Sequence, residues 1–163
     1  MIIGVRGQRQ AQVPSRLARR VATWGAVGYT RPMTTELMML TWSAVLCLIV
    51  PNLGVAGLTG VTGGFVWGLG NRDQPFEGLP AWAGRARRAH ANLVENLVVF
   101  AALVLVAVAA GKTNAWTALG AQLFFWGRIA HLATYIAGLV PWRTLAFSVA
   151  IAGEWLIVFQ LLR

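Results

Sequence analysis

Long uncharged apolar runs alternate with short polar segments along most of the chain. The first run covers residues 37–71, which contain no Asp, Glu, Lys or Arg. Because a helix needs about 20 residues to cross a bilayer, this run can span one with residues to spare. Pro51 lies inside the run and is a candidate kink. A first membrane-spanning helix is therefore predicted here.

A polar segment, residues 71–84, follows the first run and predicts a loop, because prolines, glycines and charged residues gather in it. Pro80 suits the first turn of a helix. A second helix is therefore predicted from about Pro80 to Ala110. Its first third is charged, whereas residues 96–111 carry no charge.

Two further helices are predicted in the last third of the chain. Asn114 is a predicted N-cap for a helix over residues 115–139, and Pro141 marks a short connection to a helix that ends at Leu162. Short loops make neighbouring helices antiparallel. The predicted fold is all-α: an integral-membrane four-helix bundle with up-and-down spans.

The composition agrees with a membrane protein. Hydrophobic residues make up 57% of the 163 residues and charged residues only 12%, against about 25% charged in soluble domains. This excludes a soluble enzyme, and it argues against a nucleic-acid partner despite the net charge of +9. Lipid is the expected partner. The single cysteine, Cys47, excludes an intrachain disulfide.

The first 32 residues differ from the rest, with six arginines and no acid. Met33 would be a natural start, because Thr34-Thr35-Glu36 follows it and offers a hydroxyl cap for a helix. Residues 1–32 are expected to be disordered or not translated, and residues 33–163 to form one four-span membrane domain.

Basic residues also predict the orientation. The first loop and the helix start after it carry Arg72, Arg85, Arg87 and Arg88, and the third loop carries Arg143. The second loop has a single basic residue, Lys112. The positive-inside rule therefore places the first and third loops in the cytosol.

Polar residues on two helices predict a site. Arg88, Asn92 and Glu95 fall on one stripe of the second helix. A charge in mid-bilayer costs about 2.5–3.5 kcal/mol, so Glu95 is expected to face the other helices and a cationic partner. Arg128, His131 and Tyr135 form a second stripe at i, i+3 and i+7.

Two facing stripes would make a pocket with arginines, a carboxylate, an amide, an imidazole and a phenol. The simpler alternative is that Glu95 and Arg128 pair only to hold the helices together. Neither histidine has a metal-ligand spacing to Cys or acidic residues, so no metal is expected.

The first stripe resembles the signature of the MAPEG superfamily, the membrane-associated proteins in eicosanoid and glutathione metabolism. The matching residues are Arg85, Arg88, Ala89, His90, Asn92 and Glu95. Residues 127–147 resemble the third helix and following loop of the family's prostaglandin-synthesising and glutathione-transferring members. The similarity covers roughly residues 36–162.

The resemblance implies a homotrimer that uses glutathione, or another low-molecular-weight thiol, on hydrophobic electrophiles or hydroperoxides from the bilayer. It implies that Arg143 stabilises the thiolate, with Thr144 at a neighbouring hydroxyl position. The remaining implied binding residues are Arg88, His90, Asn92, Glu95, Arg128, His131 and Tyr135.

Two positions depart from prostaglandin-synthesising members: Ala91 replaces an arginine, and Phe147 replaces a tyrosine. The lost arginine favours an alternative, a non-catalytic MAPEG-fold protein that binds a lipid or a partner. A small channel with a Glu95–Arg128–His131 relay is a third reading. One lysine among 14 basic residues suggests a GC-rich bacterial genome, and so a bacterial-type member in the inner membrane.

Overall fold

The computed structural model describes residues 32–74 and 76–163. Its helices are α2 (Thr35–Thr59), α3 (Gly64–Leu69), α4 (Ala81–Ala109), α5 (Ala115–Ala137) and α6 (Val140–Leu162). These two described ranges contain no strand. The prediction for residues 1–32 concerns a segment of which only Pro32 is described.

Three helices, α2, α4 and α6, are long and apolar enough to cross a membrane. The fourth long helix, α5, has 23 residues, the same length as α6, but it is not among them. Gln122, Arg128 and His131 interrupt the apolar sequence of α5, whereas the polar residues of α4 all precede a long apolar stretch. The all-helical prediction is confirmed, with three helices of spanning composition where the sequence predicted four.

The predicted first span is confirmed as α2, but its helix ends well before the uncharged run does. Helix α2 continues through Pro51 but ends at Thr59, and the short helix α3 follows at Gly64. Gly63 lies between them with φ of 76°, a left-handed conformation that glycine adopts without steric cost. The glycines of this run therefore break the helix, although no charge marks the break.

Side-chain caps set two of the helix starts. The Thr34 hydroxyl accepts a hydrogen bond from the Leu37 amide at 3.4 Å. The Asn114 carboxamide accepts from the Thr117 amide at 3.1 Å, while the Thr117 hydroxyl accepts from the Asn114 amide at 2.7 Å. This reciprocal pair is a capping box. Both predicted caps are confirmed, and so is a second helix close to the range 80–110.

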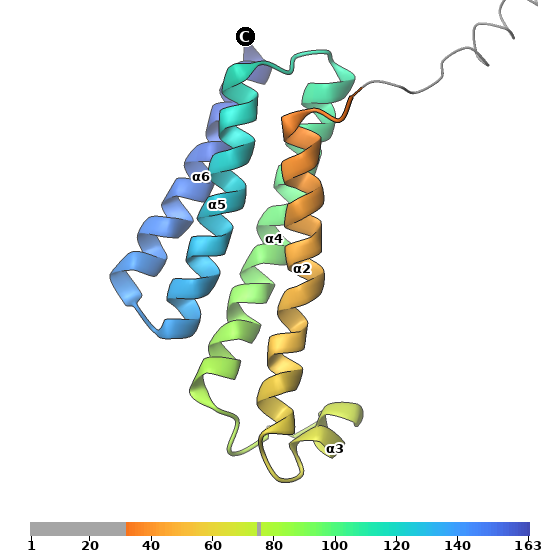
Figure 1. Cartoon of the computed structure of the whole chain (residues 1–163), viewed down its shortest axis with the longest axis vertical. Coiled ribbons are helices and arrows are strands. Elements are labelled where there is room, and N and C mark those ends of the chain that lie inside the picture. Colours follow the sequence, from red (N-terminus) through yellow and green to blue (C-terminus); the bar gives the residue numbers. More distant parts are fainter. Residues whose placement is uncertain (1–31, 75) are drawn as a thin grey trace, which may run out of the picture. The chain divides into compact units, whose positions relative to one another are not determined.

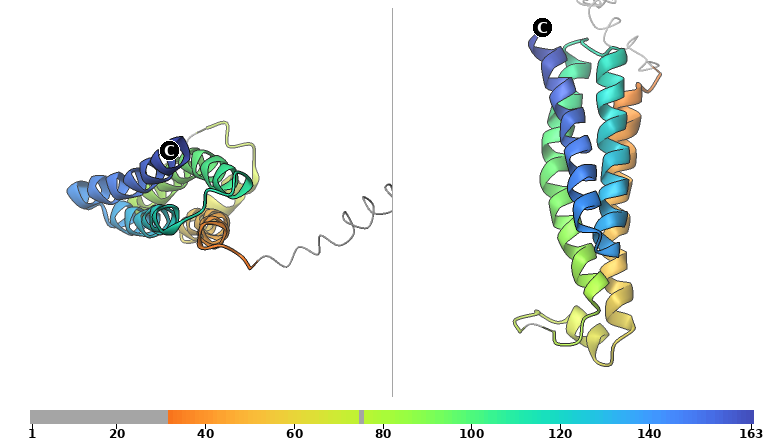
Figure 2. Two further views of the ribbon diagram at one scale, coloured as in Figure 1. Left: turned by 90° about the horizontal axis from the view of Figure 1, so that it is seen from above. Right: turned by 90° about the vertical axis from the view of Figure 1, so that its left-hand side faces the viewer.

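The four long helices lie side by side (Figures 1 and 2). Helix α5 packs most extensively on α6, α2 packs on α4, and α5 also contacts α2 and α4. Phe100 of α4 and Phe124 of α5 stack in the core with ring centroids 3.9 Å apart. The other core residues are Met39, Val104, Ala121, Phe125, Ala150 and Ile157.

One end of this unit brings the start of α4 close to the α5–α6 connection (Figure 1). The Arg85 guanidinium of α4 donates a hydrogen bond from Nε to the Ile136 carbonyl of α5 at 2.8 Å. Gly138, with φ of 79°, then turns the chain from α5 into α6. Residues near the start of α4 are thereby held beside the last turns of α5 and the first turns of α6.

Candidate functional site

A polar cavity of about 270 Å³ opens between α4, α5 and α6 at this end. Six of the nine residues predicted for the site line it, together with Phe147; the six are Arg88, Asn92, His131, Tyr135, Arg143 and Thr144. We refer to it as the thiol cleft, after the ligand that the sequence analysis predicted. The three predicted residues outside its lining are His90, Glu95 and Arg128.

Arg128 lies directly behind the thiol cleft. Only 2% of the residue is exposed, and its Nη1 donates a hydrogen bond to the Asn92 carboxamide oxygen at 2.7 Å. The guanidinium carbon lies 5.2 Å from the Phe124 ring and 5.3 Å from the Phe147 ring. Arg128 therefore orients Asn92, which lines the cleft, and is itself held between two aromatic faces.

Two donor groups of Arg128 do not take part in this hydrogen bond. Its Nε and Nη2 are buried and have no hydrogen-bond partner among the described residues. A buried donor without a partner costs free energy, so the guanidinium is not fully satisfied by the bond to Asn92.

His131 is fixed by the backbone of the next helix. Its Nδ1 lies 3.1 Å from the Arg143 carbonyl oxygen, which can only accept, so Nδ1 carries the proton and donates. The other ring nitrogen, Nε2, is buried without a partner among the described residues. The Tyr135 ring packs edge-on against the imidazole, with centroids 5.3 Å apart. His131 thus ties α5 to the residue that the sequence analysis assigned to the thiolate.

Arg143 and Tyr135 form the rim of the thiol cleft. The Arg143 guanidinium carbon lies 4.7 Å from the centroid of the Tyr135 ring, a cation–π distance. An adjoining cavity of about 230 Å³ shares Arg88, Tyr135 and Arg143 with the cleft. Arg85 lines the adjoining cavity as well, so three guanidinium groups border the two cavities. Such a lining is suited to a ligand with more than one negative group.

Glu95 is not where the sequence placed it. It is exposed on the outer side of α4, so the expectation that it faces the other helices of this chain is wrong. The carboxylate that interacts electrostatically with Arg128 is Glu154 of α6, which is 7% exposed. Sequence reasoning missed Glu154, although the argument used for Glu95, a lone acid in an apolar run, applies to it equally.

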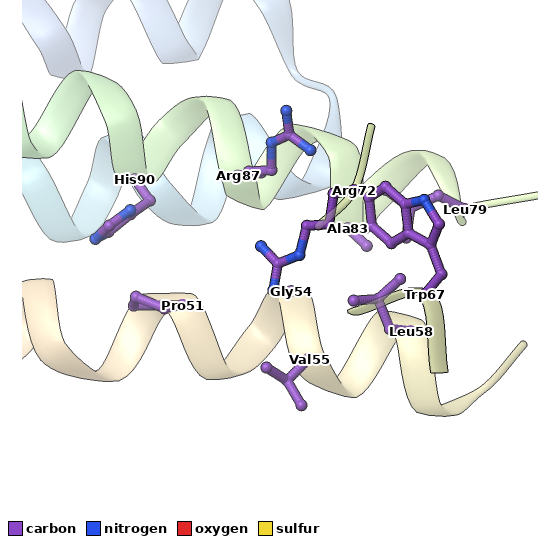
Figure 3. Close-up of a pocket in the computed structure, with 10 residues that line it drawn as sticks. All are labelled: Pro51, Gly54, Val55, Leu58, Trp67, Arg72, Leu79, Ala83, Arg87 and His90. Atoms are coloured by element: carbon purple, nitrogen blue, oxygen red, sulfur yellow. The ribbon is translucent and has the colours of Figure 1, made fainter. Parts of the chain in front are cut away.

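His90 faces a different neighbour. Its Nε2 lies 3.1 Å from the Cys47 carbonyl oxygen and 3.6 Å from the Cys47 sulfur. It lines a cavity between α2 and α4 (Figure 3), away from the thiol cleft. The helical spacing explains this: His90 is two residues after Arg88, which turns it about 200° around α4.

The comparisons with known proteins agree with the sequence signature. A model of the MAPEG family matches residues 36–163, which include all four long helices except the first residue of α2. Neither a curated protein nor a solved structure matches this chain significantly.

Proposed function

Because this chain belongs to the MAPEG family, we propose that it is an integral-membrane enzyme dependent on glutathione or a similar small thiol. It acts as a transferase or a peroxidase on hydrophobic substrates that enter from the bilayer. The supporting observation is the thiol cleft, where residues from α4, α5 and α6 meet around about 270 Å³ of polar space.

The lining of the cleft fits such a thiol. Glutathione carries two carboxylates, and Arg88 in the cleft and Arg85 in the adjoining cavity offer a guanidinium each. Asn92 supplies an amide, and Arg128 behind it has two buried donors without a partner among the described residues. These groups match an anionic tripeptide better than a neutral lipid.

Arg143 is the residue that acts on sulfur in this proposal. A thiolate is the nucleophile and a free thiol titrates near pH 8.5, so a nearby guanidinium increases the thiolate fraction at neutral pH. In the transferase reaction, the thiolate forms a carbon–sulfur bond and the leaving group departs with its electron pair. In the peroxidase reaction, it attacks the hydroperoxide and breaks the O–O bond; the alcohol and a sulfenic acid form, and a second thiol reduces the latter to disulfide and water.

The membrane setting belongs to the same proposal. Helix α5 is the fourth span, since it packs along α6 and contacts α2 and α4, and its Arg128 and His131 are buried in the protein interior. The assembly is a homotrimer of four-helix protomers, as in a bacterial-type member of the inner membrane. The loops after α2 and α5 face the cytosol, because the arginines gather at that end.

Two observations favour the non-catalytic alternative, in which the cleft binds a lipid or partner without chemistry. The Thr144 hydroxyl donates to the Val140 carbonyl at 3.3 Å, so its proton is already engaged. Ala91 also lacks the cationic group that prostaglandin-synthesising members carry there. Both features reduce the number of donors available to an anion.

The deciding experiment compares wild type with Arg143→Ala in glutathione conjugation of a generic aryl halide. We expect kcat to fall on the order of 100-fold, the usual effect of removing one charge-stabilising donor, with partial recovery in Arg143→Lys. Glutathione binding, measured by calorimetry, should change much less.

The matched control is Arg163→Ala, which removes an arginine at the far end of α6 and should keep wild-type turnover. A wild-type protein that binds no thiol at millimolar concentration would exclude the enzyme and favour the binding protein. Equal turnover in Arg143→Ala and Arg163→Ala would remove Arg143 from the mechanism.

A further inference from the structure

A second cavity lies between α2 and α4, on the side of α4 that carries His90 (Figure 3). Its volume is about 270 Å³. Gly54 opens its floor, since a Cβ built there would meet no atom within 4 Å. The rest of its apolar wall is made by Pro51, Val55, Leu58, Trp67, Leu79 and Ala83. We call this space the α2–α4 cavity.

Basic groups occupy the polar part of the α2–α4 cavity. Arg72, Arg87 and His90 all line it, and the Arg72 side chain extends between the ribbons of α2 and α4 (Figure 3). An adjoining cavity of about 460 Å³ shares Arg72, Arg87 and Trp67 and adds one acid, Asp73. The charged lining of the two cavities is thus predominantly cationic.

The position of Arg72 is held by specific contacts. Its backbone has φ of 58°, which is uncommon for a residue other than glycine. Its Nε and Nη2 donate to the Gly68 carbonyl at the end of α3, at 3.0 and 2.6 Å. The guanidinium also lies 5.8 Å from the Trp67 ring. These contacts place a cation at the mouth of an apolar cavity.

We propose that the α2–α4 cavity binds one anionic phospholipid. The phosphate lies against Arg72 and Arg87, and an acyl chain follows the wall formed by Val55 and Pro51. Two features favour a lipid over a free anion. The cavity is mostly apolar beyond its arginines, and it lies beside the end of α2, a helix of spanning composition, where headgroups are expected.

The apolar part of the cavity is continuous with an outward-facing surface of α2. Val55 lines the cavity and is 48% exposed, and Leu48, two turns earlier on the same face of α2, is 75% exposed. An acyl chain in the cavity can therefore extend along α2 into the surrounding bilayer. The site uses no residue of the thiol cleft and is independent of the proposed thiol chemistry.

The test measures quenching of Trp67 by lipids with brominated acyl chains, using the full-length protein reconstituted in phosphatidylcholine. The Trp67 signal is the difference between wild type and Trp67→Phe. A surface arginine near an anionic membrane contributes roughly fivefold in binding. Brominated phosphatidylglycerol should therefore quench Trp67 at about twentyfold lower mole fraction than brominated phosphatidylcholine.

The double variant Arg72→Gln/Arg87→Gln should lose this preference, and the control Arg163→Gln should keep it. Arg72 also supports the loop after α3, so Arg87→Gln alone serves as a second test. This variant should reduce the preference for phosphatidylglycerol about fivefold. Equal quenching by the two lipids, or an unchanged preference in Arg87→Gln, would overturn the proposal. So would full loss of the preference in millimolar inorganic phosphate, which would indicate a free-anion site.

Discussion

Arg128 and Glu154 are two charged side chains in the interior of a predominantly apolar protein. They interact electrostatically, yet each has buried polar atoms without a hydrogen-bond partner among the described residues. A buried charge left without its counter-charge is far more costly than a pair. Removing one of the two charges is therefore expected to destabilise the protein more than removing both.

A double-mutant cycle tests this dependence. We expect Arg128→Met to lower the free energy of unfolding by about 3–5 kcal/mol, because Glu154 then stays buried without its cation. Adding Glu154→Gln should recover much of the loss. Unfolding in detergent, followed by circular dichroism, gives the four values. Simple additivity of the two single effects would show that the side chains do not act as a pair.

At the scale of the helices, small residues allow α5 and α6 to approach closely. A Cβ built on Gly120 would lie 2.6 Å from the Gly153 carbonyl oxygen and 2.9 Å from Ile157 Cγ1. One on Gly127 would lie 2.9 Å from the Ala150 amide nitrogen. This close approach carries His131 of α5 to the Arg143 carbonyl of α6, so the packing of the two helices shapes the thiol cleft.

Gly120→Ala is expected to destabilise the protein, because the added methyl overlaps the backbone of α6. Overpacking of this kind costs about 1–3 kcal/mol, which thermal unfolding in detergent would show as a lower Tm. The matched control is Gly54→Ala in α2, where the new methyl meets no atom within 4 Å. There the higher helix propensity of alanine should leave Tm equal or raise it. A Tm in Gly120→Ala at or above that of wild type would contradict this packing.

At the scale of the whole molecule, exposed Glu95 lies midway along α4, in a helix of spanning composition. A carboxylate facing lipid there would cost about 2.5–3.5 kcal/mol. In the proposed homotrimer, neighbouring copies cover this side of α4 and supply the polar partners that Glu95 lacks toward lipid. The exposed position of Glu95 in one chain is then a feature of the subunit interface.

Glu95→Gln is accordingly expected to reduce the trimer fraction, measured by native mass spectrometry from detergent. The neutral amide keeps the shape of the side chain but loses its charge-assisted hydrogen bonds. Glu77→Gln, which changes an exposed acid in the loop before α4, should leave the trimer fraction unchanged. A trimer fraction in Glu95→Gln equal to that of wild type would place Glu95 away from the interface.

Much of the helical layout is predictable from local sequence signals. The caps at Thr34 and Asn114 and the uncharged stretch of α4 act within a single helix, so their effect needs no knowledge of the neighbours. The break at Gly63 was not predicted, because an apolar run without charged residues gives no local signal that a helix ends there. Only the backbone conformation there shows that α2 has ended.

Residue spacing also determined which side chains share a stripe, as Arg88 with Asn92 and His131 with Tyr135. Which helix each stripe meets was decided by the tertiary structure, because that depends on how all four long helices pack together. The tertiary structure directed His90 toward Cys47, left Glu95 exposed, and buried Glu154 within electrostatic range of Arg128. Periodicity defines a face of a helix, whereas only packing defines what that face touches.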